Sequence, residues 1–464
     1  MAGEWKEKSL FSLIDIKHGY AFSGESIHEE PIGDILLTPG NFAIGGGFKG
    51  NKFKYFVGNV PEEFVLKEGD LLITMTDLSK QTDTLGYPAF VPKSHSARFL
   101  HNQRLGKVII RSDAELDKSF LFYLLRTAKY RNEILASATG TTVKHTSPNR
   151  ILAYKTKFPL VDEQRAIAHI LGTLDDKIEL NRKMNETLEA MARAIFKSWF
   201  IDFDPVHAKA EGRDPKLPKE IADLFPDSFQ DSELGKIPKG WRVVLMPETI
   251  DINPIRSLQK GTNAPYLDMA NVQNNSARVN KVIKRPFGSG IKFMNGDTLL
   301  ARITPCLENG KTAFVDFLEH DQVGCGSTEF IVLRPKAPLP PFFGYFLARD
   351  PEFRAFAITN MSGTSGRQRV PSNCFANYKL VIPGERISVA FGQRVGAFMQ
   401  QLKFNDEQSS VLAATRDTLL PKLLAEEIRV KDAEKFVENK ACLIVTGSCA
   451  FSGILSYLRK KTAD

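Results

Sequence analysis

Residues 167–195 read IAHILGTLDDKIELNRKMNETLEAMARAI, with apolar side chains at alternating steps of four and three residues. The same pattern returns in residues 391–419, displaced by 224 positions. An apolar period of about 3.5 residues is typical of a coiled-coil seam. We therefore predict two long helices whose seams pair with each other. The predicted seam residues are Ile167, Leu171, Leu174, Ile178, Asn181, Leu188 and Ile195 in the first helix, and Phe391, Val395, Phe398, Leu402, Asn405, Leu412 and Leu419 in the second.

A polar layer interrupts both predicted seams. Asn181 and Asn405 occupy the same slot of the two patterns, and Asn185 and Ser409 occupy the next one. Polar seam residues cost stability but can fix the register of paired helices. The alternative is that each helix packs only on its own domain, and the shared polar interruption argues against it. We expect acidic side chains on the outer face of the first helix, at Asp175, Asp176, Glu179, Glu186 and Glu189.

The two helices belong to a longer internal repeat. Six short motifs recur in the same order, at offsets between 222 and 236. One such pair could arise by chance, but six in one order indicate a tandem duplication. They match Trp5 with Trp241, Ile14-Asp15-Ile16 with Ile250-Asp251-Ile252, Gly69-Asp70 with Gly296-Asp297, Ala89-Phe90-Val91 with Ala313-Phe314-Val315, Phe120–Leu125 with Phe342–Leu347, and Gly140-Thr141 with Gly363-Thr364.

The sequence of each copy predicts a mixed α/β domain followed by a long helix. We therefore expect the α+β fold class. Short β-type runs bounded by Gly, Asn and Pro predict strands, and the aromatic stretches around Tyr123 and Tyr345 predict short helices. The predicted boundaries are 1–160 for the first domain, 161–204 for its long helix, 205–238 for an acidic, proline-rich connector with a helical turn, 239–385 for the second domain, 386–428 for its long helix, and 429–464 for a tail of unknown role.

Charge is distributed unevenly along the 464 residues, whose formal net charge is +8. Residues 1–160 and 241–385 are net positive, whereas residues 161–240 are net negative. Two basic blocks separated by an acidic one suggest that two units contact a polyanion. Five cysteines without a Cys-x-x-Cys pair argue against a disulfide scaffold or a zinc ribbon and favour a reducing compartment.

Neither end of the sequence predicts a membrane anchor. The N-terminal residues lack the apolar core of a signal peptide. Ala441–Leu458 is apolar over about the thickness of a membrane, but glycines and serines interrupt it. We expect a buried or poorly ordered tail there rather than a membrane span.

No constellation of residues predicts catalysis. Gly310-Lys311-Thr312 resembles the end of a phosphate loop, but Pro305 stands where that motif needs Gly. Pro340-Pro341-Phe342 resembles the tetrapeptide of amino-methyltransferases, but Leu339 replaces the Asn or Asp that would bind the target amino group. The eight histidines are scattered, and none lies at metal-ligand spacing from another His or a Cys. We therefore predict no catalytic residue, no metal and no cofactor in this chain.

Basic and hydroxyl side chains instead gather on predicted loops that are equivalent in the two copies. Such donors grip phosphates or read base edges. A solvated surface charge is the alternative for any single residue, but the loops as groups favour nucleic-acid binding. The candidates are Thr141, Thr142, Lys144, His145, Thr74, Thr76, Lys52 and Lys54 in the first copy, and Ser365, Arg367, Gln368, Arg369, Arg302, Thr304, Lys281 and Lys284 in the second.

Two further motifs lie at the junctions between domains and helices. Residues 225–241 read FPDSFQDSELGKIPKGW, and Pro159-Leu-Val-Asp-Glu163-Gln164-Arg165 leads into the first long helix. With both repeats, the chain resembles the specificity (S) subunits of type I restriction-modification systems over roughly residues 5–428. The first copy lacks the Gly-x-Ile-Pro-x-Gly-Trp approach, and the second keeps Pro383-Gly384-Glu385-Arg386 without the full Glu-Gln pair.

This resemblance implies two target-recognition domains separated by two long helices that pack antiparallel. Each domain would read one half of a bipartite, asymmetric target in double-stranded DNA, without catalysis by the chain itself. The chain would join two adenine-N6 methyltransferase subunits, which bind S-adenosylmethionine, and usually two ATP-driven translocase-nuclease subunits, in the cytoplasm. The alternative is an orphan DNA-binding scaffold that partners a methyltransferase only.

Overall fold

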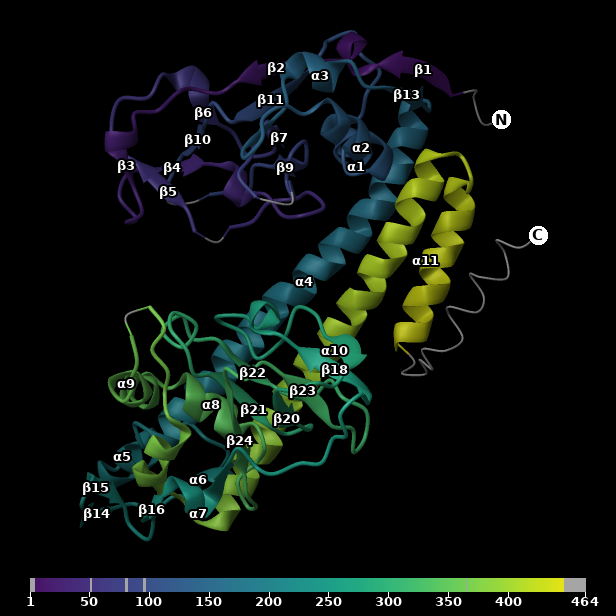
Figure 1. The fold of residues 1–464 in the computed structure, drawn as a ribbon. Helices are drawn as coiled ribbons and strands as arrows, with labels where there is room; N and C mark the ends of the chain where they lie inside the picture. The colour runs from purple at the N-terminus through teal and green to yellow at the C-terminus, as the bar shows by residue number, and fades with distance from the viewer. Residues whose placement is uncertain (1–4, 51, 80–81, 95–96, 365, 446–464) are drawn as a thin grey trace. The chain divides into compact units, whose positions relative to one another are not determined.

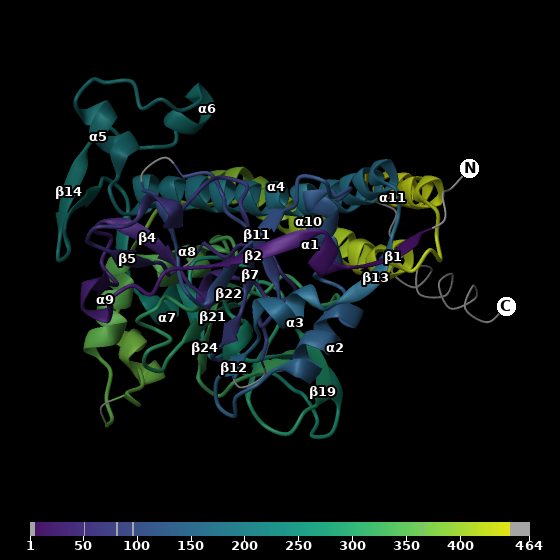
Figure 2. The same cartoon turned by 90° about the horizontal axis from the view of Figure 1, so that it is seen from above.

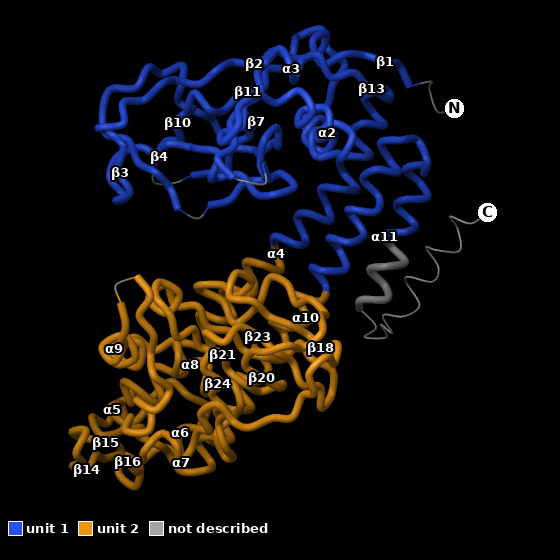
Figure 3. The backbone as a smooth tube through the Cα atoms, viewed as in Figure 1, with its two compact units in different colours: residues 1–179, 408–464 blue, residues 180–407 orange. Residues whose placement is uncertain are grey.

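The computed structural model describes residues 5–50, 52–79, 82–94, 97–364 and 366–445, with only the backbone for 438–445. The chain divides into two compact units, residues 1–179 with 408–464 and residues 180–407 (Figure 3). Each unit contains a mixed α/β head and half of each long helix. We call residues 5–160 head 1 and residues 239–384 head 2.

Two helices of 40 residues, α4 (Val161–Phe200) and α10 (Glu385–Leu424), lie side by side (Figures 1 and 2). In unit 2, Asn181 bonds to Asn405, and the rings of Phe196 and Phe391 lie 6.1 Å apart. Residue numbers rise along α4 as they fall along α10, so the two helices are antiparallel. This confirms the predicted α+β fold with an antiparallel pair of long helices. Helix α4 ends at Phe200, and Phe203, whose backbone is left-handed (φ 52°), caps the start of the next helix.

Head 1 combines a four-stranded and a five-stranded sheet with three short helices. The four-stranded sheet has the order β2-β11-β7-β9, and the five-stranded sheet has the order β3-β5-β4-β10-β6, in which β4 and β10 are parallel. Its elements are β1 (Lys6–Ser9), β2 (Ile14–His18), β3 (Ile27–His28), β4 (Asp34–Leu37), β5 (Lys54–Phe56), β6 (Val65–Leu66), β7 (Leu71–Thr74), β8 (Thr76–Asp77), β9 (Pro88–Phe90), β10 (Phe99–His101), β11 (Leu105–Ile110), α1 (Lys118–Leu124), α2 (Ala128–Ser137), β12 (Lys144–His145), α3 (Pro148–Leu152) and β13 (Lys155–Phe158).

Head 2 has two four-stranded sheets, ordered β17-β24-β21-β22 and β19-β18-β23-β20. Its one parallel contact among the described residues, between β18 and β23, matches the β4–β10 contact of head 1. Its elements are β16 (Arg242–Leu245), α7 (Met246–Thr249), β17 (Ile250–Ile252), β18 (Asn263–Leu267), β19 (Ile283–Pro286), β20 (Ile291–Phe293), β21 (Thr298–Ala301), β22 (Thr312–Phe314), β23 (Gly324–Gly326), β24 (Phe330–Pro335), α8 (Phe343–Arg349), α9 (Pro351–Thr359) and β25 (Lys379–Ile382).

The two heads share one strand order, and head 1 adds the strand β3 at one edge. The order β2-β11-β7-β9 corresponds to β17-β24-β21-β22, and β5-β4-β10-β6 corresponds to β19-β18-β23-β20. In each head a separate strand pair, β1–β13 or β16–β25, joins the beginning of the head to the segment just before its long helix. The duplication seen in the sequence is therefore a duplication of topology.

The predicted connector carries more structure than a helical turn. It contains α5 (Asp204–Ala210), α6 (Lys219–Ala222) and an antiparallel hairpin of β14 (Phe229–Ser232) and β15 (Gly235–Pro238), which the sequence did not predict. Phe225 is 2% exposed and lies 5.1 Å from the ring of Trp199 on α4. Apolar contacts thus fix this segment on unit 2.

Each half of the helix pair completes the core of the unit that contains it. In unit 1, Leu171 of α4 and Leu419 of α10 belong to the same buried cluster as Phe120 of head 1. In unit 2, Trp199 and Phe391 join the cluster of head 2. The tail begins with α11 (Val430–Val445), whose Ala433 is buried in the unit 1 cluster.

Candidate nucleic-acid interface

In head 1, three separate segments of the chain meet beyond the end of β7. The segment 75–77 lies in the middle, the turn before β11 contacts one side, and the loop that contains β12 contacts the other. We call this arrangement the junction of head 1, and it joins the two loop regions that the sequence singled out. Its backbone contacts are Met75 N to Arg104 O (2.9 Å), Thr146 N to Met75 O (2.9 Å), and the β8–β12 ladder that pairs Lys144 with Asp77 and His145 with Thr76.

Head 2 repeats this junction bond for bond. The segment 302–304 takes the middle position, Glu329 lies on one side, and residues 368–370 lie on the other. The offsets from head 1 are 227, 225 and 224 residues, in agreement with the duplication. The backbone contacts are Arg302 N to Glu329 O (2.9 Å), Val370 N to Arg302 O (2.8 Å), Thr304 N to Gln368 O (3.1 Å), and the bridge between Ile303 and Arg369.

At the junction of head 1 the middle segment is buried, with Thr76 6% exposed, whereas the side chains of the neighbouring loop reach the surface. Thr141, Thr142 and His145 are exposed, and Lys144 is half-buried. The hydroxyl of Thr76 lies 3.1 Å from Nδ1 of His145, which fixes the imidazole at the edge of β12. The loop residues are therefore accessible, whereas the prediction that Thr76 contacts a ligand is wrong, because Thr76 is buried.

Thr74 corrects the prediction for that position. Its side chain is 0% exposed, and its hydroxyl donates to the carbonyl groups of Thr84 and Tyr87 inside the head. All four residues of β7 are buried, so the strand lies inside the head and Thr74 with it. Thr74 thus supports the junction and does not present its hydroxyl to a ligand.

Asp77 holds the loop that follows β8. Its carboxylate accepts hydrogen bonds from Ser79 N (2.6 Å), Leu85 N (3.0 Å) and the hydroxyl of Thr84 (2.8 Å). Burial acts to raise the pKa of Asp77, but the hydrogen bonds from Ser79 and Thr84 outweigh it and keep that pKa below its ordinary value. The ionised carboxylate fixes the loop beside the junction.

The junction of head 2 carries a closed ion pair. Nε of Arg369 lies 2.9 Å from Oε2 of Glu329, and Nη2 lies 2.8 Å from Oε1. This hydrogen bonding raises the pKa of Arg369. Arg367 is exposed, and its guanidinium has no partner within the residues that the structure describes. The two predicted arginines therefore differ: Arg369 is paired with Glu329, whereas the guanidinium of Arg367 has no partner among the described residues.

The remaining candidates of head 2 surround this pair. The hydroxyl of Thr304 accepts from Gln368 N at 3.1 Å, and Gln368 is half-buried. Arg302 is half-buried, and its buried Nε finds no partner in the described part of the chain. Ser365 lies outside the described residues.

The candidate lysines lie on different elements from the junctions. Lys54 belongs to β5 and Lys284 to β19, the equivalent strands of the two heads, and both side chains are exposed. Lys52 and Lys281 are exposed in the loops that precede these strands. The lysines form a second basic region in each head, separate from the junction in the strand order.

Sequence reasoning missed Arg104 and Glu329. Arg104 is exposed, and its guanidinium has no partner in the described ranges. Glu329 occupies the same position of head 2, because Met75 N bonds to Arg104 O as Arg302 N bonds to Glu329 O. The offset of 225 residues between the two could have paired them, had the strands on both sides been aligned.

The predicted seam residues line the interior of the helix pair. Ile178, Leu188, Ile195 and Phe398 are half-buried against the cores of the two units. The others are 9% exposed or less: Ile167, Leu171, Leu174, Asn181, Phe391, Val395, Leu402, Asn405, Leu412 and Leu419.

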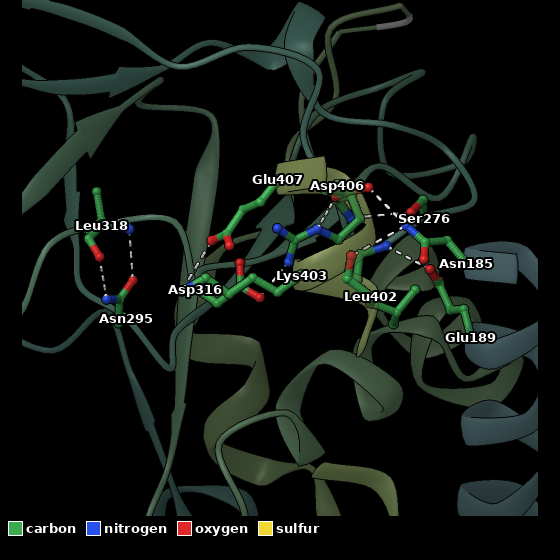
Figure 4. A network of polar contacts seen from close by, with 12 residues as sticks. Asn185, Glu189, Ser276, Asn295, Asp316, Leu318, Leu402, Lys403, Asp406 and Glu407 are labelled. Carbon is green, nitrogen blue, oxygen red and sulfur yellow. Dashed lines mark hydrogen bonds and ion pairs between the residues drawn. The ribbon is translucent and has the colours of Figure 1, made fainter. Parts of the chain in front are cut away.

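The polar layer of the seam is a hydrogen-bonded network in unit 2. Nδ2 of Asn405 donates to Oδ1 of Asn185 at 2.8 Å, and Nδ2 of Asn181 donates to the carbonyl of Asn405 at 3.2 Å. Nδ2 of Asn185 also donates to the carboxylate of Asp406 at 2.8 Å and to the carbonyl of Leu402 at 3.3 Å (Figure 4). Because these bonds need one alignment, the network fixes the register of α4 against α10.

Two of the five acids expected on the outer face of α4 turn inward. Glu189 is 3% exposed, and its carboxylate accepts from the hydroxyl of Tyr345 and, at 3.0 Å, from Ala277 N. Asp175 is half-buried between Arg126 (2.8 Å) and Arg416 (2.5 Å). The outer-face prediction is therefore wrong for Glu189 and Asp175. Asp176, Glu179 and Glu186 are exposed.

Burial and neighbouring charges oppose each other at Asp175. Burial acts to raise the pKa of Asp175, but the guanidinium groups of Arg126 and Arg416 outweigh it and keep the pKa below its ordinary value. The hydroxyl of Tyr123 also donates to this carboxylate, at 2.9 Å. An ionised Asp175 therefore joins head 1 to both long helices inside unit 1.

Neither a metal site nor a membrane span appears within the described residues. No group of three His, Cys, Asp or Glu side chains there is arranged to hold a metal ion. No helix of the described ranges is both long and apolar enough to cross a membrane. Most of the apolar stretch Ala441–Leu458 lies outside these ranges.

Known proteins share both sequence and fold with this chain. Residues 2–190 match the model of the type I restriction modification DNA specificity domain. The HindI specificity subunit of Haemophilus influenzae is 24% identical over 67% of this chain and 77% of its own length. The MjaIX specificity subunit of Methanocaldococcus jannaschii is 26% identical over 68% of this chain and 69% of its own length.

A crystal structure supports the likeness in fold. The S subunit of a type I restriction-modification system from M. genitalium superposes with a TM-score of 0.51 at 17% identity, over 91% of this chain and 96% of that one. The matched domain model, the related specificity subunits and the duplicated heads on paired helices agree. In sequence and in fold, the chain is therefore similar to the specificity subunits of type I restriction-modification systems.

Proposed function

We propose that the chain is the DNA-specificity subunit of a type I restriction-modification complex. Head 1 and head 2 each recognise one half of a bipartite, asymmetric target in double-stranded DNA. Recognition is its task, and the chemistry belongs to other subunits, in line with relatives that are named specificity subunits.

The observation that carries this proposal is the repeated junction with unlike side chains. Both heads hold three segments in the same backbone arrangement, but Arg104 and His145 in one correspond to Glu329 and Arg369 in the other. A common frame lets both heads approach DNA in the same manner, while different donors and acceptors select different bases. An asymmetric target follows from this combination.

The partners follow from the family. We propose two adenine-N6 methyltransferase subunits that carry S-adenosylmethionine, and two translocase-nuclease subunits that consume ATP, in the cytoplasm where the DNA lies. The exposed acids of α4, Asp176, Glu179 and Glu186, suit contact with protein better than contact with phosphates.

The test is a methylation assay with a library of random duplexes. The chain is co-purified with its methyltransferase, and N6-methyladenine is mapped by sequencing. We expect one motif of two short specified blocks separated by an unread spacer, and no methylation without the chain. Methylation that does not depend on the chain, or a single unsplit motif, contradicts the proposal. DNA-stimulated ATP hydrolysis after addition of the translocase subunit distinguishes a restriction complex from a methyltransferase-only scaffold.

A further inference from the structure

The structure assigns a specificity-determining role to one position that the two heads occupy with opposite charges, Arg104 and Glu329. We propose that Arg104 reads a base of the half-site bound by head 1. We propose that Glu329 acts in head 2 as a positioning residue, which orients Arg369 toward its base. This inference rests on the proposed function, and it names the side chains that make the two half-sites differ.

The equivalence of the two positions is set by backbone hydrogen bonds. Arg104 O accepts from Met75 N, and Glu329 O accepts from Arg302 N, each at 2.9 Å. On the opposite side of the middle segment, His145 forms a two-bond bridge with Thr139, as Arg369 does with Ser362. Relative to His145, Arg104 therefore occupies the backbone position that Glu329 occupies relative to Arg369.

In head 2 the side chains at these two positions meet. Three donor-acceptor contacts of 2.8–3.0 Å join the guanidinium of Arg369 to the carboxylate of Glu329. These contacts cross the middle segment at Ile303. In head 1 the corresponding positions hold Arg104, His145 and, in the place of Ile303, Thr76.

The chemistry of the two faces differs accordingly. Arg104 is exposed and has no partner in the described ranges, so all five donors of its guanidinium are available. A free guanidinium matches O6 and N7 of guanine with two parallel hydrogen bonds. In head 2 a carboxylate at this position repels phosphates, but it fixes the plane of Arg369, whose Nη1 does not contact Glu329 and donates to the carbonyl of Arg367 at 3.2 Å. A fixed guanidinium loses less conformational entropy on binding than a mobile one.

The experiment uses the chain with its methyltransferase and the random duplex library, scoring methylation block by block. Arg104→Gln is expected to lower discrimination at one position of one block by roughly tenfold to a hundredfold, with the other block unchanged. Arg104→Lys is expected to show the same loss, because an ammonium keeps the charge but cannot form two parallel bonds. Lys155→Ala is the control: this exposed cation of head 1 lies on β13, in a different sheet.

Glu329→Ala is tested in the same assay for the other block. We expect reduced discrimination there, and no further loss when Arg369→Ala is added, because Glu329 acts through Arg369. The thermal unfolding midpoints of the variants should stay near that of the native chain, since the pair is exposed.

Each outcome separates this inference from the proposed function. If the native complex gives no bipartite motif, the proposed function fails. If the native motif is bipartite but Arg104→Gln leaves both blocks intact, or weakens methylation equally on all sequences, the role of Arg104 is overturned. Losses from Glu329→Ala and Arg369→Ala that simply add overturn the positioning role of Glu329.

Discussion

Head 1 and head 2 share a backbone but not the groups that stabilise it. In each head a tyrosine of a short helix donates a hydrogen bond to a carboxylate of α4: Tyr123 of α1 to Asp175, and Tyr345 of α8 to Glu189. The two acids are not equivalent in the repeat, since both lie on the first long helix. The duplication kept the tyrosine, and each copy then acquired its own acceptor.

A second anchor is the same in both heads. Nε of Arg126 donates to the carbonyl of Gly45 at 2.7 Å, and Nη1 of Arg349 donates to the carbonyl of Asn274 at 2.8 Å. Both arginines follow the tyrosine on or just after the short helix, and both lie over its ring. Structural contacts of this kind were kept, whereas the side chains at the junctions diverged. The comparison shows that the backbone arrangement can stay the same while the side chains at the junctions change.

The largest effect should come from removing the acceptor of head 2. Glu189→Ala leaves the hydroxyl of Tyr345 and the amide of Ala277 buried without a partner, and should lower the free energy of unfolding by about 3–5 kcal/mol. Glu189→Gln keeps an acceptor oxygen, so it should lower the free energy of unfolding by less than half as much as Glu189→Ala. Urea denaturation measures both.

Asp175→Ala is the matched variant in head 1. It should cost clearly less than Glu189→Ala, because Asp175 is only half-buried and water can reach the groups it leaves. Equal losses would mean that the two anchors do not differ.

Acid should weaken head 1 more than head 2 through one buried histidine. His101 of β10 is 0% exposed, and burial lowers its pKa from 6.5 to about 4, whereas the equivalent residue of β23 is Gly326. The unfolded chain binds a proton near pH 6.5 and the folded chain only near pH 4. The contribution of neutral His101 to the free energy of unfolding is therefore fully present above pH 6.5. About 3 kcal/mol of it is lost as the pH falls towards 4.

Hydrogen exchange between pH 7 and pH 5 measures this difference head by head, after correction for the intrinsic exchange rate. Protection of β10 and β4 should decrease, whereas protection of β23 and β18 should change less. His18→Gln, at an exposed position, is the control and should leave the pH dependence unchanged. Equal loss of protection in both heads would contradict the role of His101.

The start of each long helix offers a matched pair of smaller effects. Gln164 is 1% exposed and bonds to Asp117 N (2.8 Å), the carbonyl of Glu115 (3.2 Å) and the carbonyl of Pro159 (2.9 Å). Gln164→Ala should cost about 2 kcal/mol, since it leaves buried groups unpaired. Its counterpart Ser388 is 0% exposed with a hydroxyl that has no partner within the described residues, so Ser388→Ala should change stability by less than about 0.5 kcal/mol. Thermal unfolding of both variants checks this contrast.

The smallest effect concerns the free arginine of head 2. Arg367→Ala should weaken binding by about 1 kcal/mol, at one half-site only. Lys284→Ala, on β19 of the same head, should weaken binding to all sequences alike and reduce its salt dependence. Fluorescence anisotropy with duplexes altered in one half-site at a time measures both. A uniform loss with Arg367→Ala would make it a phosphate contact.

Much of the fold could be predicted because it depends on patterns that repeat. Ile167 to Ile195 and Phe391 to Leu419 predicted the helix pair, since the 3.5-residue period encodes the apolar stripe directly. The repeat also matched the loop 140–146 with the loop that begins at Gly363 in the second copy. Thr74 was misassigned, since whether a strand-end hydroxyl points in or out depends on the neighbouring strands.

The sequence by itself determined the duplication, the α+β class and the positions of the polar layer, because periodicity and internal repetition are properties of one chain read along its length. Only the tertiary structure decided that Arg104 and the loop of His145 flank the same segment, residues 75–77, that Glu329 pairs with Arg369, and that Glu189 turns inward. These contacts join residues 40 or more positions apart in the chain. Strand pairing and burial bring them together, and no local pattern of residue types encodes such pairings.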